Sequence, residues 1–315
     1  MNEKITKIKN EVGKVVIGQE KMIDGLLVGL LCEGHILIEG IPGLAKTTTV
    51  NALSQALGLG FKRVQFTPDL LPSDILGAEI YDPHQNQFKI KQGPVFTNLL
   101  LADEINRAPA KVQSALLEVM QEKQVTIGEE SFKLSPPFFV MATQNPVEQE
   151  GVYQLPEAQL DRFMMKLVVG YNTKEEELEI ARRISNKSNA SISAVVSLAE
   201  LEELKQEVAS VHMDDEVEKY MIELVSATRN PSEYGLDEIV DYLQFGASPR
   251  VSIDMFKAVK AMAFLRGKDY VSPVDIAYII KEIMRHRIIL TYEAEAEGIT
   301  ADQVIDKIVQ AVAIP

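Results

Sequence analysis

The stretch "ILIEGIPGLAKTTTV", from Ile36 to Val50, constrains the fold more than any other part of this sequence. An apolar run, a glycine-containing turn and a helix-forming segment follow one another, which is typical of a phosphate-binding loop between a strand and a helix. Gly40 and Gly43 let the chain turn with its N–H groups inward, and the helix N-terminus adds positive potential. In such a loop Lys46 would reach the β- and γ-phosphates of a nucleotide, and the Thr47 hydroxyl would bind Mg²⁺.

Ala45 is the mismatch in this loop, because the G-x-x-x-x-G-K-[ST] pattern has glycine at its position. We expect Ala45 to adopt right-handed helical dihedrals, where a methyl group is tolerated. Pro42 removes one N–H group but stiffens the turn. An ordinary tight turn is the alternative interpretation of this stretch.

The segment "LLLADEINR" predicts a buried strand that ends in Asp103 and Glu104, the arrangement called Walker B. Asp103 would lie beside the phosphate loop, at the second coordination shell of Mg²⁺. Glu104 would polarise the water that attacks the γ-phosphorus. The alternative is a solvated acidic pair at a strand end.

Three further polar positions are candidates for the same site. The apolar strand "FFVMATQNP" ends in Asn145, whose amide could hold the nucleophilic water or sense the γ-phosphate, with Gln144 as a weaker candidate. Arg162 is expected on a helix after the last core strand, and Arg250, in "GASPR", at a helix start. Each arginine taken alone is more simply interpreted as a surface residue.

Strands and helices alternate up to about residue 171, which favours a parallel sheet with crossover helices. The expected strands are "HILIEG", "KRVQF", "NLLLADE" and "FFVMATQN", and the expected helices span Thr47–Leu57 and Ala110–Lys123. From Asn172 onward, capping boxes open helices at "TKEE" and "SLAE", and Ser272 and Pro273 open another. We therefore expect an α/β domain over residues 1–171 and a smaller all-α domain over residues 172–315. The tract "SNKSNASIS" is expected to be a polar loop.

The composition limits the classes of partner and compartment. The net charge of −14 disfavours a nucleic-acid partner, because it repels phosphate backbones. The N-terminus does not resemble a signal peptide and no run is long enough to span a membrane, so a cytoplasmic location is expected. The single cysteine, Cys32, is expected to be a buried thiol. The four histidines show no metal-ligand spacing, and His286, in "RHR", is expected at the surface.

The order of these motifs resembles that of an AAA+ ATPase, and the amino-acid sequences of the motifs are similar to those of the MoxR family. The resemblance extends over nearly the whole chain, and the segments that carry it are "GIPGLAKT", "LLLADEINRAP", "ALLEVMQEKQVTIG", "FFVMATQNPVEQEGVYQLPEAQLDRF", "GASPR" and "AFLRGKDYVSP". The resemblance implies an AAA+ P-loop core with a parallel five-stranded sheet flanked by helices, and a helical lid. Ala45 also fits, because the loop of this family commonly reads G-x-P-G-x-A-K-[ST].

The resemblance further implies the roles of individual residues. Asn145 corresponds to sensor 1, Arg162 to an arginine finger that reaches the nucleotide of a neighbouring subunit, and Arg250 to sensor 2, in cis or in trans. Arg107 is a second choice for the interface arginine. The residues implied in nucleotide binding are Val16, Ile17 and Gly18 near adenine, and Gly40, Pro42, Gly43, Leu44, Ala45, Lys46, Thr47 and Thr48 around the phosphates.

Two insertions fit the same family. "TPDLLPSDILGAEIYDPHQNQFKIKQGPVF", at about residues 67–95, predicts a hairpin inserted into a helix, and "QVTIGEESFKLSPPFF", at about residues 124–137, predicts a second hairpin turning at Gly128 and Glu129. Such hairpins could contact a substrate at the pore of a ring. Surface decoration is the alternative.

The resulting hypothesis is a Mg²⁺-dependent ATPase that works as a ring, expected to be a homo-hexamer, with chaperone-like action on client proteins. The family resemblance implies remodelling, maturation or metal-cofactor insertion, with proteins carrying von Willebrand factor A domains as possible clients. A nucleic-acid-dependent AAA+ motor is the alternative. A GTPase is disfavoured, because "NKSN" at Asn186 lacks the aspartate of an N-K-x-D guanine-binding motif.

Overall fold

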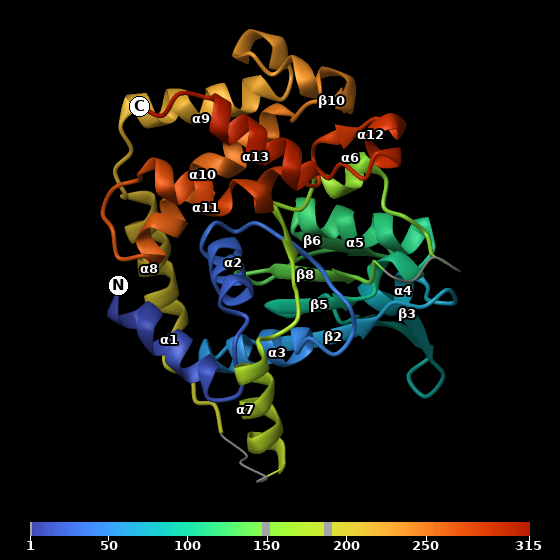
Figure 1. Ribbon diagram of the computed structural model, residues 1–315. Coiled ribbons are helices and arrows are strands. Elements are labelled where there is room, and N and C mark those ends of the chain that lie inside the picture. The colour runs from blue at the N-terminus through green and yellow to red at the C-terminus, as the bar shows by residue number, and fades with distance from the viewer. Residues whose placement is uncertain (1, 147–151, 186–190) are drawn as a thin grey trace.

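A computed structural model describes residues 2–146, 152–185 and 191–315 of the chain, and Figure 1 shows its arrangement. The centre is a sheet of five parallel strands in the order β2-β5-β8-β1-β9. Their bounds are β1 Ile36–Glu39, β2 Phe61–Gln65, β5 Leu99–Asp103, β8 Phe139–Gln144 and β9 Met165–Val168. The four strands expected from the sequence are present, and β9 is the fifth.

Alternate residues of the strands are buried in different clusters, which shows that both faces of the sheet are covered. Leu99 and Leu101 belong to one hydrophobic cluster, whereas Leu100 and Ala102 belong to the other. Successive side chains of a strand point to opposite faces, so a continuous apolar run is what a doubly covered strand requires. The helices of this half are α1 Glu3–Gly13, α2 Glu20–Leu31, α3 Lys46–Ala56, the short α4 Pro72–Leu76, α5 Ala110–Glu122 and α6 Glu157–Leu160, with a 3-10 turn η1 at Ile105–Arg107.

The rest of the chain is mainly helical, and the helices from α9 onward lie above the sheet in Figure 1. A two-stranded antiparallel pair, β10 with β11, is an addition to the all-α expectation. The elements are α7 Lys174–Ser185, α8 Leu198–Ala209, α9 Asp215–Ala227, η2 Pro231–Tyr234, η3 Asp237–Tyr242, β10 Leu243–Phe245, α10 Pro249–Leu265, α11 Pro273–Met284, β11 Ile289–Leu290, α12 Tyr292–Ala296 and α13 Ala301–Ala311. A parallel five-stranded sheet flanked by helices, followed by a smaller and mostly helical part, confirms the expected fold class.

Local sequence signals set several helix starts. The capping boxes at Ser197 and Ser272 are present, and Pro273 occupies the first turn of α11. The Thr173 hydroxyl accepts from the Glu176 N–H, and the Glu176 carboxylate accepts from the Thr173 N–H. These bonds satisfy amides that have no partner inside the helix.

Both expected hairpins are present. The first pairs β3 Gly77–Asp82 with β4 Gln87–Gln92 after a short helix, α4 Pro72–Leu76, and projects from the sheet in Figure 1. The second pairs β6 Gln124–Ile127 with β7 Glu130–Lys133 and turns at Gly128 and Glu129, as expected. The first hairpin follows a helix of one turn and leads directly through a turn to β5, so no helix resumes after it.

Two expectations about Arg162 are wrong. It lies in the turn after α6, not on a helix, because α6 ends at Leu160. It also precedes the last core strand, since β9 follows it. In the described ranges, no helix is both long and apolar enough to cross a bilayer. The tract "SNKSNASIS" lies largely outside the described residues.

His35 is buried just before β1 and joins three elements of the core. Its Nδ1 accepts from the Val140 N–H at 3.0 Å, and its Nε2 lies 3.0 Å from the Met120 carbonyl oxygen, to which it donates. This pair of bonds requires the neutral ring. Burial lowers the pKa of His35 from 6.5 to about 4.

We therefore expect acid to destabilise the protein through His35. The unfolded imidazole takes up a proton below about pH 6.5, whereas the folded one does so only near its pKa of about 4. The free energy of unfolding should fall by about 2 kcal/mol through this residue between pH 7 and pH 5. Urea titrations at both pH values should show a smaller difference for His35→Gln than for the wild type, and an undiminished one for His84→Gln, an exposed control. An equal pH dependence of wild type and His35→Gln would refute this assignment.

Candidate functional site

A cavity of about 390 Å³ lies at the edge of the sheet where the carboxyl ends of β1, β5 and β8 meet. These three strands are neighbours, so polar residues at their ends face a common space. The residues that line it are Pro42, Gly43, Leu44, Ala45, Lys46, Thr47, Thr48, Arg63, Asp103, Glu104, Thr143, Gln144 and Asn145. Most of the residues expected around the phosphates, metal and water are therefore brought together.

The loop after β1 has the geometry of an anion cradle. Gly43 has φ +87°, a conformation that favours glycine, and a Cβ at Gly40 would lie 2.8 Å from the Val169 carbonyl oxygen. The Lys46 ammonium donates to the Gly40 carbonyl at 2.6 Å. Burial lowers the pKa of Lys46, while Asp103, Glu104 and Glu39 act in the opposite direction. The first three residues of α3 line the same cavity, and amides at a helix start have no intrahelical partners.

Ala45 does not have the right-handed dihedrals expected from the sequence. Its φ of 54° and ψ of 18° place it in the left-handed region. A methyl group there costs about 1–2 kcal/mol relative to the right-handed conformation. The glycine of the usual pattern is therefore replaced at a position whose backbone still favours glycine.

Both oxygens of Asp103 are bound by neighbouring side chains. Thr143 Oγ1 donates to Oδ1 at 2.5 Å, and Arg63 donates to Oδ2 from Nε at 2.9 Å and from Nη2 at 2.6 Å. The Thr143 hydroxyl also accepts from the Glu104 N–H at 2.8 Å. Thr143 thus fixes the position of both acidic residues relative to β8.

Glu104 is held by two side chains on one of its oxygens. Gln65 Nε2 donates to Oε2 at 2.6 Å, and Arg107 Nε lies 3.2 Å from the same atom. Glu104 has φ 57° and ψ 50°, a left-handed conformation that turns the chain at the end of β5. Non-glycine residues in this region are uncommon and are concentrated at functional sites.

Sequence reasoning missed Arg63, Gln65 and Thr143, which hold the two carboxylates. Arg63 and Gln65 are two residues apart in β2, so they point to the same side, and Gln65 pairs in register with Asp103. Thr143 lies near the end of β8, two residues before Asn145, and both residues line the cavity. Polar residues at alternate positions near a strand end were the available signal.

The three remaining polar candidates differ in where they lie. The buried Asn145 lines this cavity, whereas Arg162 and Arg250 lie outside it. Arg162 Nη1 donates to the Leu117 carbonyl at 3.1 Å, and Arg250 Nη1 lies 3.3 Å from both the carbonyl and Oδ2 of Asp161. Arg250 lies in the first turn of α10, which begins at Pro249, as expected from "GASPR".

A second cavity, of about 450 Å³, lies between α2, the end of β9 and α11. Val169 and Gly170 line it, and Val169 also contacts the start of the phosphate loop at Gly40. Val16, Ile17 and Gly18 do not line either cavity. However, Asn172 Nδ2 donates to the Ile17 carbonyl at 2.9 Å, and Asn172 lines the second cavity.

Of two expectations outside the site, the one for Cys32 is confirmed. Its thiol packs against the core and burial raises its pKa to about 12, although the residue as a whole is only partly buried. His286 is buried, with 8% of its surface exposed, so the surface assignment is wrong.

Comparison with known proteins identifies relatives over the whole chain. Residues 35–165 match the ATPase family associated with various cellular activities (AAA), and residues 239–308 match the AAA lid domain. The chain is 47% identical to Chaperone MoxR1 of Mycobacterium tuberculosis, over 97% of this chain and 81% of that protein. It is 31% identical to Protein MoxR of Paracoccus denitrificans, over 90% of this chain and 89% of that protein. A crystal structure of a Cytophaga hutchinsonii protein is 55% identical and superposes with a TM-score of 0.94, over 99% of this chain and 95% of that one.

The left-handed backbone at Ala45 makes a prediction about stability. Ala45→Gly should raise the free energy of unfolding by about 0.5–1 kcal/mol, because relief of the positive φ exceeds the entropy that glycine adds to the unfolded chain. Ala52→Gly, at a buried position inside α3, the helix that follows Ala45, should lower the free energy of unfolding. Urea denaturation without nucleotide measures both. A lower stability of Ala45→Gly would contradict the strain assigned here.

Proposed function

This chain belongs to the MoxR family of AAA+ ATPases, and we propose that it hydrolyses ATP with Mg²⁺ in a ring-shaped oligomer that remodels client proteins. One observation carries the catalytic part of this proposal. The loop lysine, the acidic pair at the end of β5 and the amide at the end of β8 line a single cavity at one edge of the sheet. That set contains the groups that phosphoryl transfer to water requires.

The phosphates would be held by the loop. Amides of residues 43–48 and the ammonium of Lys46 provide hydrogen bonds and positive charge to the β- and γ-phosphates. Leu44, Ala45 and Thr48 would contribute through the loop backbone and helix start, and Gly40 through its close approach to Val169, just after β9. The adenine would lie in the 450 Å³ cavity, near Ile17 and Gly18, whose backbone is tied to Asn172 at its wall.

The residues present fit a Mg²⁺ ion. Thr47 and Asp103 offer a hydroxyl and a carboxylate to the same cavity, the oxygen ligands that Mg²⁺ prefers. Because Arg63 and Thr143 bind both oxygens of Asp103, a contact through water suits this carboxylate better than a direct one. Within the described ranges no cluster of three or more His, Cys, Asp or Glu side chains could hold a metal, which suits an ion bound mainly by phosphates and water. When bound, Mg²⁺ would supply positive charge that stabilises the negative charge developing on the phosphate oxygens.

Glu104 would act as the general base. To do so it has to orient one oxygen toward a water molecule near Asn145, while Gln65 and Arg107 hold Oε2. Arg162 and Arg250 lie outside their own cavity, so we assign Arg162 to the nucleotide of a neighbouring subunit and leave Arg250 to act in cis or in trans. A finger supplied in trans makes hydrolysis depend on assembly, because it contributes about 10³–10⁵ in rate.

A chaperone-like role is supported by the relative named Chaperone MoxR1. We infer that the clients are proteins, possible examples being those with von Willebrand factor A domains, and that the work takes place in the cytoplasm in a hexamer. The hairpins β3–β4 and β6–β7 are the candidate contacts with a client. The net charge of −14 weighs against a nucleic-acid motor.

Substitutions in the cavity should separate binding from hydrolysis. Glu104→Gln should bind ATP but hydrolyse it about 10²–10⁴-fold more slowly, because it loses the base. Lys46→Ala should weaken ATP binding by about 10- to 100-fold, since a hydrogen bond to a charged group contributes about 1.5–3 kcal/mol. Equilibrium binding of a fluorescent ATP analogue and phosphate release measure the two effects. Retained turnover in Glu104→Gln would assign the base to another group.

Mixing of inactive subunits should test the finger. Arg162→Ala subunits keep their own base, and Glu104→Gln subunits keep their finger, so each lacks what the other has. We expect phosphate release from the mixture to exceed that of either variant alone, in proportion to the mixed interfaces. A mixture no more active than its components would argue against an arginine supplied in trans.

A further inference from the structure

The basic residues of "RHR", Arg285, His286 and Arg287, lie in the turn directly after α11 and point into the protein. All three bond to backbone carbonyls of a short segment of the core that contains Arg162. The bonds are Arg287 Nη2 to Asp161 O at 2.9 Å, His286 Nε2 to Phe163 O at 2.9 Å, Arg287 Nη1 to Met164 O at 3.3 Å and Arg285 Nη1 to Lys166 O at 3.0 Å. One turn of the C-terminal half therefore holds the backbone on both sides of Arg162.

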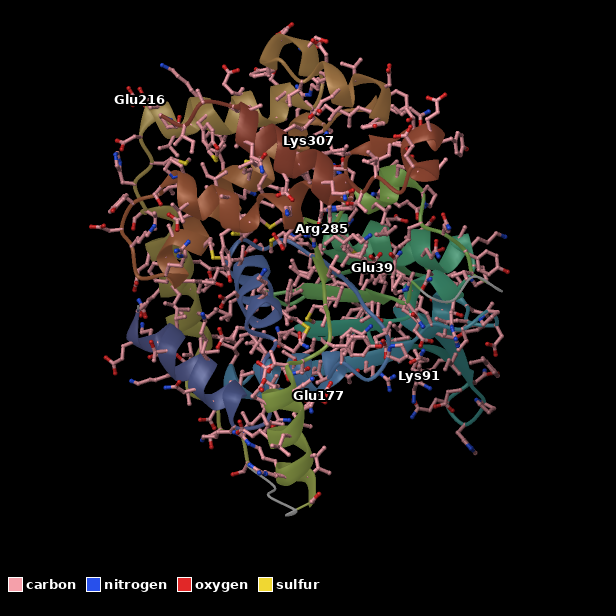
Figure 2. The ribbon with its side chains drawn as sticks, in the orientation of Figure 1. Glu39, Lys91, Glu177, Glu216, Arg285 and Lys307 are labelled. Carbon is pink, nitrogen blue, oxygen red and sulfur yellow. The ribbon has the colours of Figure 1, made fainter. Side chains whose placement is uncertain are left out.

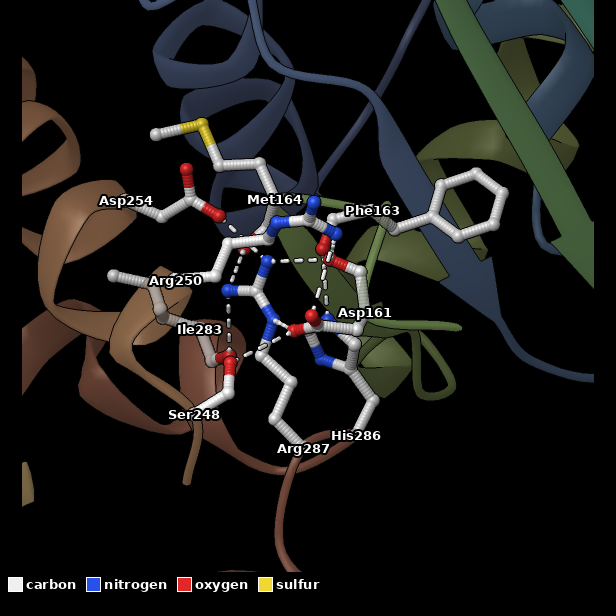
Figure 3. A network of polar contacts seen from close by, with 9 residues as sticks. All are labelled: Asp161, Phe163, Met164, Ser248, Arg250, Asp254, Ile283, His286 and Arg287. Atoms are coloured by element: carbon white, nitrogen blue, oxygen red, sulfur yellow. Dashed lines mark hydrogen bonds and ion pairs between the residues drawn. The ribbon is translucent and has the colours of Figure 1, made fainter. Parts of the chain in front are cut away.

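Arg287 is the centre of this arrangement, and Figure 3 shows its guanidinium between two carboxylates. Its Nε lies 2.9 Å from Asp161 Oδ1, and its Nη2 lies 2.5 Å from Asp254 Oδ2. Only 1% of its side chain is exposed, so its charge is compensated inside the protein. A planar guanidinium can bind two acids and two carbonyls at once, which an ammonium group cannot.

His286 and Arg285 complete the contact from either side. Burial lowers the pKa of His286 well below its usual value, and Arg287 lowers it further, so the ring donates to Phe163 as a neutral group. Arg285 is anchored by Asp302 of α13 through two bonds of 2.8 and 3.0 Å. Figure 2 shows Arg285 where the C-terminal helices meet the sheet.

Arg162 is exposed, although the three residues after it are buried. Its backbone is fixed, because the Phe163 N–H donates to Leu160 O and the Met164 N–H donates to His35 O. The side chain is free to leave the Leu117 carbonyl without disturbing this backbone. An exposed arginine on a rigid base is the arrangement that delivery to an adjacent molecule requires.

We propose that Arg285, His286 and Arg287 form a clamp that positions the turn of Arg162 for the nucleotide of the neighbouring subunit. This inference rests on the proposed role of Arg162 as a finger in trans. The clamp residues touch neither phosphate nor water and act as positioning residues. Asp161 also binds Arg250 of α10, so the clamp joins the Arg162 turn to the helix that carries the proposed sensor 2.

Hydrogen exchange tests the clamp independently of catalysis. In the full chain, Arg287→Lys should keep the positive charge but lose the planar guanidinium that bonds to several acceptors at once. The amides of Phe163 and Met164 should then exchange about tenfold faster. Asp161→Asn opens the clamp from its other side and should do the same, which covers the case in which Arg287→Lys does not fold. Lys281→Ala, which removes an exposed ion pair between α11 and Asp306, is the matched control and should leave these amides unchanged. Unchanged exchange in both clamp variants would overturn the proposal.

Kinetics then distinguish positioning from general damage. Arg287→Lys should lower kcat by about 10- to 100-fold, because a small displacement of a catalytic group has this effect. Its KM for ATP should change by no more than about twofold, since its own cavity is intact. A raised KM with unchanged kcat would mean that Arg287 supports the nucleotide cavity instead, and would overturn the proposal.

Mixed subunits show on which side of the interface the clamp acts. Glu104→Gln subunits should restore activity to Arg162→Ala subunits, but Glu104→Gln/Arg287→Lys subunits should not. Conversely, Arg287→Lys subunits should be active when a Glu104→Gln subunit supplies an intact finger. If Glu104→Gln subunits do not restore activity to Arg162→Ala subunits, the finger assignment and the clamp are both wrong. If they do, and Glu104→Gln/Arg287→Lys subunits restore it equally well, the clamp alone is wrong.

Discussion

The side-by-side pairing of β1, β5 and β8 is the constraint on which the site depends. The carboxyl ends of parallel strands lie at one edge of a sheet. The pairing of the strands alone therefore brings together the loop after β1, the acids at the end of β5 and the amide after β8. Thr143 reinforces the alignment by binding Asp103 with its hydroxyl and accepting from the Glu104 amide. A change in the register between β5 and β8 would separate these groups and remove the cavity.

Two residues at this edge have backbone conformations that cost free energy. Ala45 and Glu104 both lie in the left-handed region, one at the start of α3 and the other at the end of β5. Residues in such conformations persist only where the surroundings determine them. Ala45 is held at the start of α3, where its carbonyl accepts from the Thr49 N–H. Glu104 is held by its bonds to Thr143, Gln65 and Arg107. The strain directs the loop amides and the Glu104 carboxylate toward the same space.

The sequence predicted the fold well where local patterns decide it. Four core strands, two helices of the α/β half (α3 and α5) and both hairpins follow from apolar runs and turn residues, and the parallel sheet follows from their alternation. The strand β9 was missed, because a run of four residues after "LDRF" carries little periodic signal. The dihedrals of Ala45 were predicted wrongly, since a sequence pattern does not state which backbone conformation a substituted residue keeps.

For the site, the sequence named the loop and the acids but not the residues that orient them. Arg63 and Gln65 act through β2, whose position beside β5 is set by a crossover and not by neighbouring sequence. His286 was expected at the surface, because a histidine between two arginines in a helical segment suggests solvent. Its burial depends on the segment after Asp161, which lies more than a hundred residues earlier in the chain. Tertiary context of this kind is not encoded in local patterns.

Contacts between the two halves of the chain explain why nucleotide binding and assembly could influence each other. The turn after α11 bonds to the segment that leads into β9, and β9 pairs with β1, which begins the phosphate loop. The wall of the second cavity also uses α2, β9 and α11. A displacement of α11 relative to the sheet would therefore change the shape of that cavity and move the Arg162 turn at the same time. Because α11 lines the cavity and the turn after it holds the Arg162 segment, a movement of this helix would connect the fit of a subunit's own nucleotide to what the subunit presents to its neighbour.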